Sequence, residues 1–174
     1  ISTSELLKLF WAHGLKTIPG GGAEVLSNRV RKKISPLKLS ADEWMRITRE
    51  AHLVGFKTTA TLMFGHAEED EDIIEHLSRV RDLQDETNNF LSFIPWTFKP
   101  ENTFMEKKIS KEIGGDRYLR VLGLSRIFLD NFSHIQGSWF TQGFKVGGLS
   151  LHYGANDVGG KLMQEDVLKS GNNP

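Results

Sequence analysis

Apolar and polar positions along this chain follow helical spacing in some stretches and strand spacing in others. Two capping boxes, Ser2–Glu5 and Ser40–Glu43, predict helix starts, and apolar residues at helical spacing follow each of them. Gly14 and Gly55 are placed to end these helices. Acidic residues from 68 to 72 predict the start of a further helix, because negative charge is favourable near a helix N-terminus.

Short apolar segments between the helices predict strands. Lys57–Phe64 combines threonine with apolar residues, as strands do. The other predicted strands are Leu15–Ile18, Phe90–Phe98 and His134–Phe140, and later helices are predicted at about 116–132, 142–153 and 162–169. Alternation of helices and strands argues for a parallel sheet covered by helices.

The predicted fold class is therefore α/β, with about four β/α units, which is half of a (β/α)8 barrel. Residues 1–169 form this half, and 170–174 form a polar tail. Half a barrel leaves two sheet edges and its interior open. We therefore expect either the other half of the barrel or a second copy of the chain as a partner.

The composition excludes several kinds of site. The chain carries 22 basic and 22 acidic side chains, which gives no electrostatic footprint for nucleic acid or a membrane surface. Cysteine is absent, which excludes disulfides and thiolate metal sites, and the histidines show no zinc spacing. No apolar run is long enough for a membrane span, so a cytoplasmic protein is expected. The start at Ile1 indicates the middle of a longer protein.

A glycine-rich segment, Gly20-Gly21-Gly22, follows the first predicted strand. Glycines there let a ligand approach the backbone N–H groups closely, and Glu24 is placed to accept from ribose hydroxyls or an amino group. The spacing matches neither a P-loop nor a dinucleotide motif. A flexible turn and a ligand-binding loop are equally supported.

A basic cluster follows this segment, formed by Arg29, Arg31, Lys32 and Lys33. Charge runs of this kind are usually solvated, and that reading is favoured. A carboxylate or phosphate partner is the minority alternative.

Polar residues at the ends of the predicted strands are candidates for chemistry. Thr61 lies on the strand face that points inward in a barrel, where polar residues are unusual. His66 and Glu68 follow the end of that strand, and His66 is placed to act as a general base or hydrogen-bond donor. A structural role is the usual alternative for a single histidine.

Aromatic and carboxamide side chains follow the later strands. Trp96 and Trp139 are candidates for the walls of a site for a planar substrate, although core packing explains them equally well. Asn156 and Asp157 precede two glycines and are expected in a polar loop that closes a pocket, with an Asx-turn at a helix start as the alternative.

Five segments together resemble, in order, a group of radical S-adenosylmethionine enzymes. This group includes two enzymes of the futalosine route to menaquinone and a deazaflavin-forming synthase. The segments are residues 18–26 (IPGGGAEVL), 59–68 (TATLMFGHAE), 93–98 (FIPWTF), 136–139 (QGSW) and 154–160 (GANDVGG). Pro95-Trp96 followed by residues 100–103 (PENT) favours the cyclase of the futalosine route over its sister enzymes.

The resemblance implies that this chain supplies strands five to eight of a barrel. It implies a [4Fe–4S] cluster and S-adenosylmethionine as cofactors, a radical that takes a ribose hydrogen from dehypoxanthine futalosine, and closure to a spiro product. It places Gly20, Gly21, Gly22 and Glu24 at the S-adenosylmethionine site. The substrate chamber would be lined by a second set, of which His66, Glu68 and Asp157 are the catalytic candidates and the remainder are Thr61, Trp96, Trp139 and Asn156.

One departure from this group is large. Its members hold the cluster with a CxxxCxxC motif in the first strands of the barrel, and this chain has no cysteine. The isolated chain is therefore expected to be inactive, and three alternatives stay open. They are the C-terminal part of the cyclase, the same part of aminofutalosine synthase or the deazaflavin-forming synthase, and a non-catalytic half-barrel that self-associates.

Overall fold

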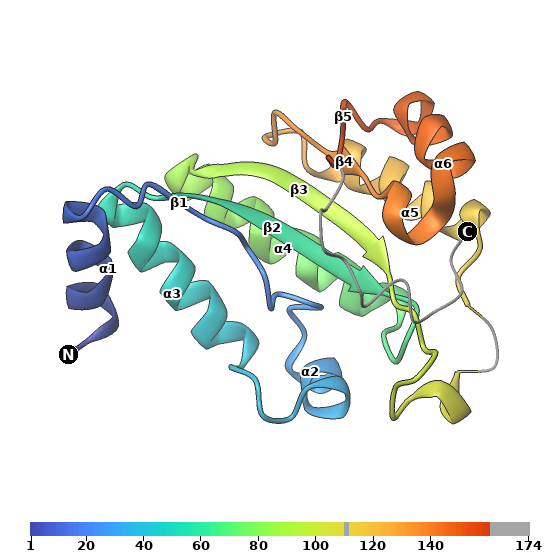
Figure 1. Cartoon of the computed structure of the whole chain (residues 1–174), viewed down its shortest axis with the longest axis horizontal. Coiled ribbons are helices and arrows are strands. Elements are labelled where there is room, and N and C mark those ends of the chain that lie inside the picture. The colour runs from blue at the N-terminus through green and yellow to red at the C-terminus, as the bar shows by residue number, and fades with distance from the viewer. Residues whose placement is uncertain (110–111, 161–174) are drawn as a thin grey trace.

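The computed structural model describes residues 1–109 and 112–160 as an α/β fold with parallel strands. Strand β1 (Thr17–Ile18) pairs with β2 (Lys57–Phe64), and β2 pairs with β3 (Phe90–Thr97). Strand β4 (Gln136–Gly137) pairs with β5 (Asp157–Val158), and a parallel bridge from Phe93 to Ile135 brings this pair beside β3. The described strands therefore lie side by side in chain order (Figure 1).

Helices connect these strands. They are α1 (Thr3–Ala12), α2 (Asn28–Ile34), α3 (Ala41–Val54), α4 (Asp70–Thr87), α5 (Gly115–Phe128) and α6 (Trp139–Ser150), with the 3-10 turns η1 (Glu106–Lys108) and η2 (Leu151–Tyr153). Figure 1 shows α4 running behind β2 and β3. Among the described residues, no helix is both long and apolar enough to cross a membrane.

Local sequence signals explain where the first helices begin and end. Ser2 and Ser40 each form a complete capping box with the glutamate three residues later, as predicted. Gly55 ends α3 in the left-handed conformation, also as predicted. Acidic residues fill the first turn of α4, where their negative charge interacts favourably with the positive end of the helix dipole.

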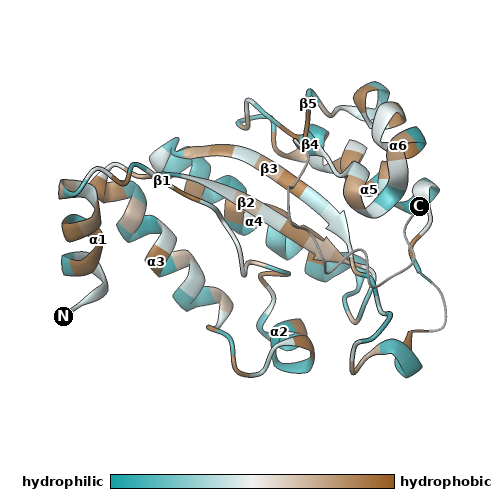
Figure 2. Ribbon diagram, in the orientation of Figure 1, coloured by the Kyte–Doolittle hydropathy of each residue, from teal (hydrophilic) through white to brown (hydrophobic). Residues whose placement is uncertain are grey.

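The core lies between the sheet and the helices that cover its outer face. Ala60, Leu62 and Phe64 alternate along β2 and are fully buried in the same cluster as Leu77 and Val80 of α4. Figure 2 shows brown, hydrophobic stretches on β2 and β3 and on the helices packed against them. The opposite face of β2 carries Thr59 and Thr61, which are only partly buried.

Three local predictions differ from the structure. The strand predicted at 134–140 is reduced to Gln136–Gly137, because α6 begins at Trp139. Asp157–Val158, predicted as part of a loop, pairs with β4 as a fifth strand. The basic cluster forms α2, and Arg31 in it is buried at 3% exposure, so the prediction of a solvated face is wrong for this residue.

The remaining predictions agree closely or lie outside the description. The predicted strand Lys57–Phe64 has the bounds of β2. The helix predicted at 116–132 is present as α5 but ends at Phe128. The helix predicted at 162–169 and the tail at 170–174 lie outside the described residues.

Candidate functional site

The glycine segment lies against the inner face of β2. The Gly20 N–H donates to Thr59 Oγ1 at 2.9 Å, and Thr61 Oγ1 donates to the Gly20 carbonyl at 3.2 Å. A Cβ atom at Gly20 would lie 1.6 Å from the Thr59 carbonyl oxygen, so only glycine fits there. Of the predicted site residues, the structure thus brings Gly20 and Thr61 into contact.

The remaining loop residues form a tight turn. Gly21 is exposed, and Gly22 has a φ of 79°. Glu24 has a φ of 48°, which is unusual for a residue with a side chain. Its carboxylate is 11% exposed and pairs with Lys38 at 2.6 Å, while its carbonyl accepts from the Met63 N–H at 2.8 Å. The side chain and the backbone carbonyl of Glu24 are therefore both held in place.

His66 and Glu68 form one buried pair after the end of β2. His66 Nδ1 lies 2.9 Å from Glu68 Oε2, and the side chains are 0% and 9% exposed. Glu68 also accepts from the backbone N–H groups of Gly65 and His66 at 2.6 and 2.9 Å. Burial alone would raise the pKa of Glu68, but contacts with the His66 ring and these N–H groups outweigh it and lower the pKa.

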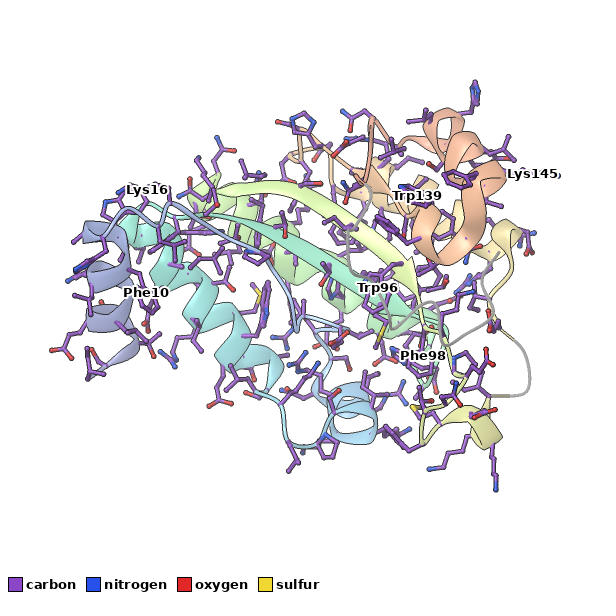
Figure 3. All side chains as sticks on the ribbon, in the orientation of Figure 1. Phe10, Lys16, Trp96, Phe98, Trp139 and Lys145 are labelled. Carbon is purple, nitrogen blue, oxygen red and sulfur yellow. The ribbon has the colours of Figure 1, made fainter. Side chains whose placement is uncertain are left out.

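A polar and aromatic surface covers the inner face of the sheet towards its carboxyl end. The register pairs Thr61 with Ile94 and Met63 with Trp96, and neighbours in register point to the same face. Thr61, Ile94 and Trp96 are only partly buried. Figure 3 shows Trp96 and Trp139 in the half of the molecule that holds this end of the strands, away from Phe10 and Lys16.

Trp139 begins α6, beyond β4. Its indole Nε1–H donates to the Gly159 carbonyl at 2.6 Å, and its ring stacks on Phe144 at a centroid distance of 4.7 Å. Gly147 lies against it so closely that a Cβ there would come within 2.5 Å of Trp139 Cβ. These contacts fix the ring beside the residues that follow β5.

Asn156 and Asp157 are consecutive residues whose side chains make different contacts. Asn156 Oδ1 accepts from the Ile135 N–H at 2.9 Å and from Arg126 at 3.1 Å, and its Nδ2–H donates to the Ser133 carbonyl at 2.8 Å. Asp157 is exposed and accepts from Gln136 Nε2 at 3.2 Å. The Asn156 amide thus holds the entry into β4, whereas the Asp157 carboxylate remains open to solvent.

Asn156→Ala is expected to lower the free energy of unfolding by about 1–3 kcal/mol, because it leaves the Ile135 N–H and the Ser133 carbonyl without side-chain partners. Urea unfolding measures this change. Asn156→Asp keeps the acceptor for Ile135 and is the matched control, with a smaller expected loss. Equal stability of the alanine variant and the unmodified protein would contradict the role assigned to this amide.

Two residues contact the glycine loop, residues 20–24, in a way that the sequence did not predict. Arg31 donates to the Gly22 and Ala23 carbonyls, and Lys38 pairs with Glu24. Lys38 is 14 residues away from its partner and no periodicity links the two. Only the return of the chain between α2 and α3 brings them together, and no local pattern signals it.

The chain's side chains fit one implied cofactor and not the other. A [4Fe–4S] cluster needs cysteine thiolates, and this chain has none. The glycine loop does fit a ligand with acceptor atoms. Among the described residues, no acceptor is bonded to the N–H groups of Gly21, Gly22, Glu24 or Val25, and a Cβ at either glycine would meet nothing within 4 Å.

Two solved structures share the fold at low sequence identity. Methylornithine synthase (PylB) aligns with a TM-score of 0.68 and 21% identity, covering 89% of this chain and 43% of that one. HydG, a maturase of the [FeFe]-hydrogenase, aligns with a TM-score of 0.72 and 12% identity, covering 90% of this chain and 35% of that one. At this identity the likeness establishes the fold alone.

Curated relatives match nearly the whole chain. The cyclic dehypoxanthine futalosine synthase of Streptomyces coelicolor is 44% identical over 98% of this chain and 42% of its own length. The 5-amino-6-(D-ribitylamino)uracil–L-tyrosine 4-hydroxyphenyl transferase of Methanococcus vannielii is 42% identical over 98% of this chain and 48% of its own. The aminodeoxyfutalosine synthase of Thermus thermophilus is 41% identical over 98% and 46%. The chain therefore spans less than half the length of these enzymes.

A family model defines the membership. The model described as the CofH/MqnC C-terminal region matches residues 87–174, which is half of the chain. The matched residues include β3, α5, β4, α6 and β5. Together with identity above 40% to curated enzymes along nearly the whole chain, this match shows that the chain belongs to the CofH/MqnC C-terminal region family.

Proposed function

We propose that this chain is the C-terminal half of a (β/α)8 barrel in a radical S-adenosylmethionine cyclase. The cyclase would convert dehypoxanthine futalosine to cyclic dehypoxanthine futalosine in the route to menaquinone. One observation carries the proposal, namely that the glycine loop lies on a half-exposed inner sheet face that also bears Thr61 and Trp96. The relative with this activity in Streptomyces coelicolor supports the choice of reaction.

The arrangement of strands supports a half-barrel. The strands are parallel and adjacent in chain order, and helices cover the outer face. In a complete barrel, inward-pointing side chains are covered by strands on the far side. Here the inner side chains Thr59, Thr61 and Ile94 are only partly covered, and β1 and β5 each have one strand partner among the described residues.

The cofactor side of the proposed site is the glycine loop. Gly21 and Gly22 bring backbone N–H groups to S-adenosylmethionine, Gly20 holds the loop against β2, and Glu24 borders the cofactor. When bound together with its cluster, S-adenosylmethionine supplies the 5′-deoxyadenosyl group that takes a hydrogen atom from the substrate ribose. The cluster ligands must come from outside this chain, because it has no cysteine. The chain alone is therefore proposed to be inactive.

The substrate side is the inner sheet face beyond the loop. Trp96 and Trp139 provide flat apolar walls for an aromatic ring. Asp157, which is exposed, accepts hydrogen bonds from substrate hydroxyls. His66 and Glu68, whose Nδ1 and Oε2 atoms lie 2.9 Å apart, are the proposed polar pair beside the reacting group. Thr61 and Asn156 act through the backbone they bind, at Gly20 and at Ile135.

Product analysis tests the proposed reaction. The protein at its full length, with iron and sulfide restored without oxygen and a low-potential one-electron reductant added, would be incubated with S-adenosylmethionine and dehypoxanthine futalosine. Mass spectrometry is expected to find 5′-deoxyadenosine and the spiro-cyclic nucleoside. Absence of both, with the cluster and both substrates present, would refute the function.

The sister reactions are separated by the same measurement. The futalosine and deazaflavin-route relatives differ by only a few per cent in identity to this chain, so the choice rests on Pro95-Trp96 and residues 100–103. Turnover of a sister substrate in place of dehypoxanthine futalosine would reassign the enzyme. For the self-associating alternative, size-exclusion chromatography under dilution is the test, and a dilution-dependent, inactive oligomer would favour it.

Trp96→Ala is expected to raise the KM for the nucleoside at least about tenfold, because contact with a large aromatic face stabilises a planar ligand by about 1.5–3 kcal/mol. The dissociation constant of S-adenosylmethionine should stay within about twofold, since Trp96 is on β3 whereas the loop contacts β2. Trp96→Phe keeps an aromatic face and serves as the control. Equal loss of affinity for both ligands would contradict the separation of the two sites.

A further inference from the structure

Arg31 is a buried cation whose hydrogen bonds, in the described part of the chain, all go to backbone carbonyls. It is 3% exposed and lies in α2. Its Nη1 donates to the Gly22 carbonyl at 3.0 Å and the Ala23 carbonyl at 2.5 Å, and its Nε donates to the Leu39 carbonyl at 2.7 Å. Burial of a guanidinium is costly, so a structure that keeps one buried must gain from its geometry.

The carbonyls of the glycine loop are all occupied. Besides the two held by Arg31, the Gly20 carbonyl accepts from Thr61 Oγ1 at 3.2 Å and the Gly21 carbonyl from Trp44 Nε1 at 3.3 Å. The Glu24 carbonyl accepts from the Met63 N–H at 2.8 Å. Five consecutive carbonyls, Gly20 to Glu24, thus have donors from α2, α3 and β2.

The N–H groups of the same loop differ from its carbonyls, because most of them have no partner among the described residues. Among the described residues, none of the N–H groups of Gly21, Gly22, Glu24 and Val25 has an acceptor. Val25 is fully buried, and an unpaired buried N–H is unfavourable. With its carbonyls held, the loop offers only donors to a ligand, and the accessible ones are the N–H groups of the exposed Gly21 and the partly exposed Gly22.

We propose that Arg31 is a positioning residue that sets the affinity for S-adenosylmethionine by holding the Gly22 and Ala23 carbonyls away from the ligand. The inference rests on the proposed function, which places that cofactor at the loop. Arg31 does not touch the ligand in this account. Its forked geometry is what matters, because one group reaches three carbonyls from the helix, which the single ammonium of a lysine does not match.

The neighbouring Arg29 provides a matched control. It lies in the same helix but forms ion pairs with Glu69 and Asp72, and within the described part of the chain no hydrogen bond or ion pair joins it to the loop. Arg31→Lys and Arg29→Lys both keep the positive charge and replace the forked guanidinium by a single ammonium group. Only the first removes donors from the loop carbonyls.

The experiment measures two constants on each variant of the full-length, cluster-containing protein. For Arg31→Lys the dissociation constant of S-adenosylmethionine is expected to rise at least about tenfold, while the KM for the nucleoside changes less than about twofold. Arg29→Lys should change neither. Since a general loss of structure would weaken both ligands, the split separates positioning from a merely structural role.

If Arg31→Lys does not fold, Trp44→Phe gives the second test, because it removes the donor to the Gly21 carbonyl and keeps an aromatic core side chain. S-adenosylmethionine binding should weaken in the same direction. Unchanged affinity in the variant that folds overturns the inference while the proposed function stands. Failure of the unmodified protein to bind S-adenosylmethionine overturns both.

Discussion

Gly20→Ala is expected to destabilise the protein by about 3 kcal/mol or more and to abolish S-adenosylmethionine binding. The added Cβ would lie 1.6 Å from the Thr59 carbonyl oxygen and 2.4 Å from its carbon. Because both atoms belong to the backbone of β2, no side-chain rotation removes the clash, and overpacking of this kind costs about 1–3 kcal/mol or more. The loop must then leave β2, which also breaks the two threonine contacts to Gly20.

Gly21→Ala is the control for this substitution. A Cβ at Gly21 meets nothing within 4 Å, and its backbone is not left-handed. Its stability is expected to stay within about 0.5 kcal/mol of the unmodified protein. Urea unfolding of both variants and equilibrium dialysis with S-adenosylmethionine measure the two effects. A stable Gly20→Ala protein that binds the cofactor normally would show that the close approach to β2 is not required.

Acidification from about pH 6.5 to pH 4 is expected to remove several kcal/mol of stability. Burial lowers the pKa of His76 to about 3 and the pKa of His52 to about 4. His76 is fully buried and accepts from the Leu26 N–H at 3.1 Å, and His52 lies between Thr87 and Thr58. Among the described residues, no carboxylate is hydrogen-bonded to either ring to hold a proton there.

The sign of the effect follows from which state binds the proton. In both histidines the folded pKa lies below the unfolded value of 6.5, so the unfolded chain takes up protons first as the pH falls. The contribution of each histidine to the free energy of unfolding is fully present above pH 6.5, and it is lost as the pH falls toward the pKa of that histidine in the folded state. Each histidine contributes a slope of about 1.4 kcal/mol per pH unit between the two pKa values.

His76→Asn tests this account. Its amide oxygen occupies the position of Nδ1 along the side chain and keeps an acceptor for Leu26, but the side chain does not titrate. The slope of unfolding free energy against pH, from urea unfolding at pH 4.5 to 6.5, should fall by about 1.4 kcal/mol per pH unit. His134→Gln changes an exposed histidine and should leave the slope as it is. An unchanged slope in His76→Asn would contradict the account.

Regular elements with their own local signals were predictable from the sequence. The capping boxes at Ser2 and Ser40 and the alternation along β2 each depend on residues close together in the chain. The order of helices and strands then favoured a parallel sheet. The strand predicted at 134–140 was too long, because the residues from Trp139 onward belong to α6 and a short apolar run has no period of its own.

The detailed site was less predictable, because its contacts join distant parts of the chain. Arg31 looks like one member of a basic cluster, and only the path of the loop makes it the donor to Gly22 and Ala23. Asn156 was predicted to line the substrate chamber, and the structure shows its amide bonding the backbone at Ile135 and Ser133. Such side-chain to backbone contacts leave no periodic signal in the sequence.

Amide hydrogen exchange tests most directly the central claim, that the glycine loop binds the cofactor. The full-length protein would be compared with and without saturating S-adenosylmethionine. We predict slower exchange in a peptide covering residues 20–26, whose N–H groups at Gly21, Gly22, Glu24 and Val25 have no acceptor among the described residues. Unchanged exchange in this peptide while the cofactor is bound would contradict it.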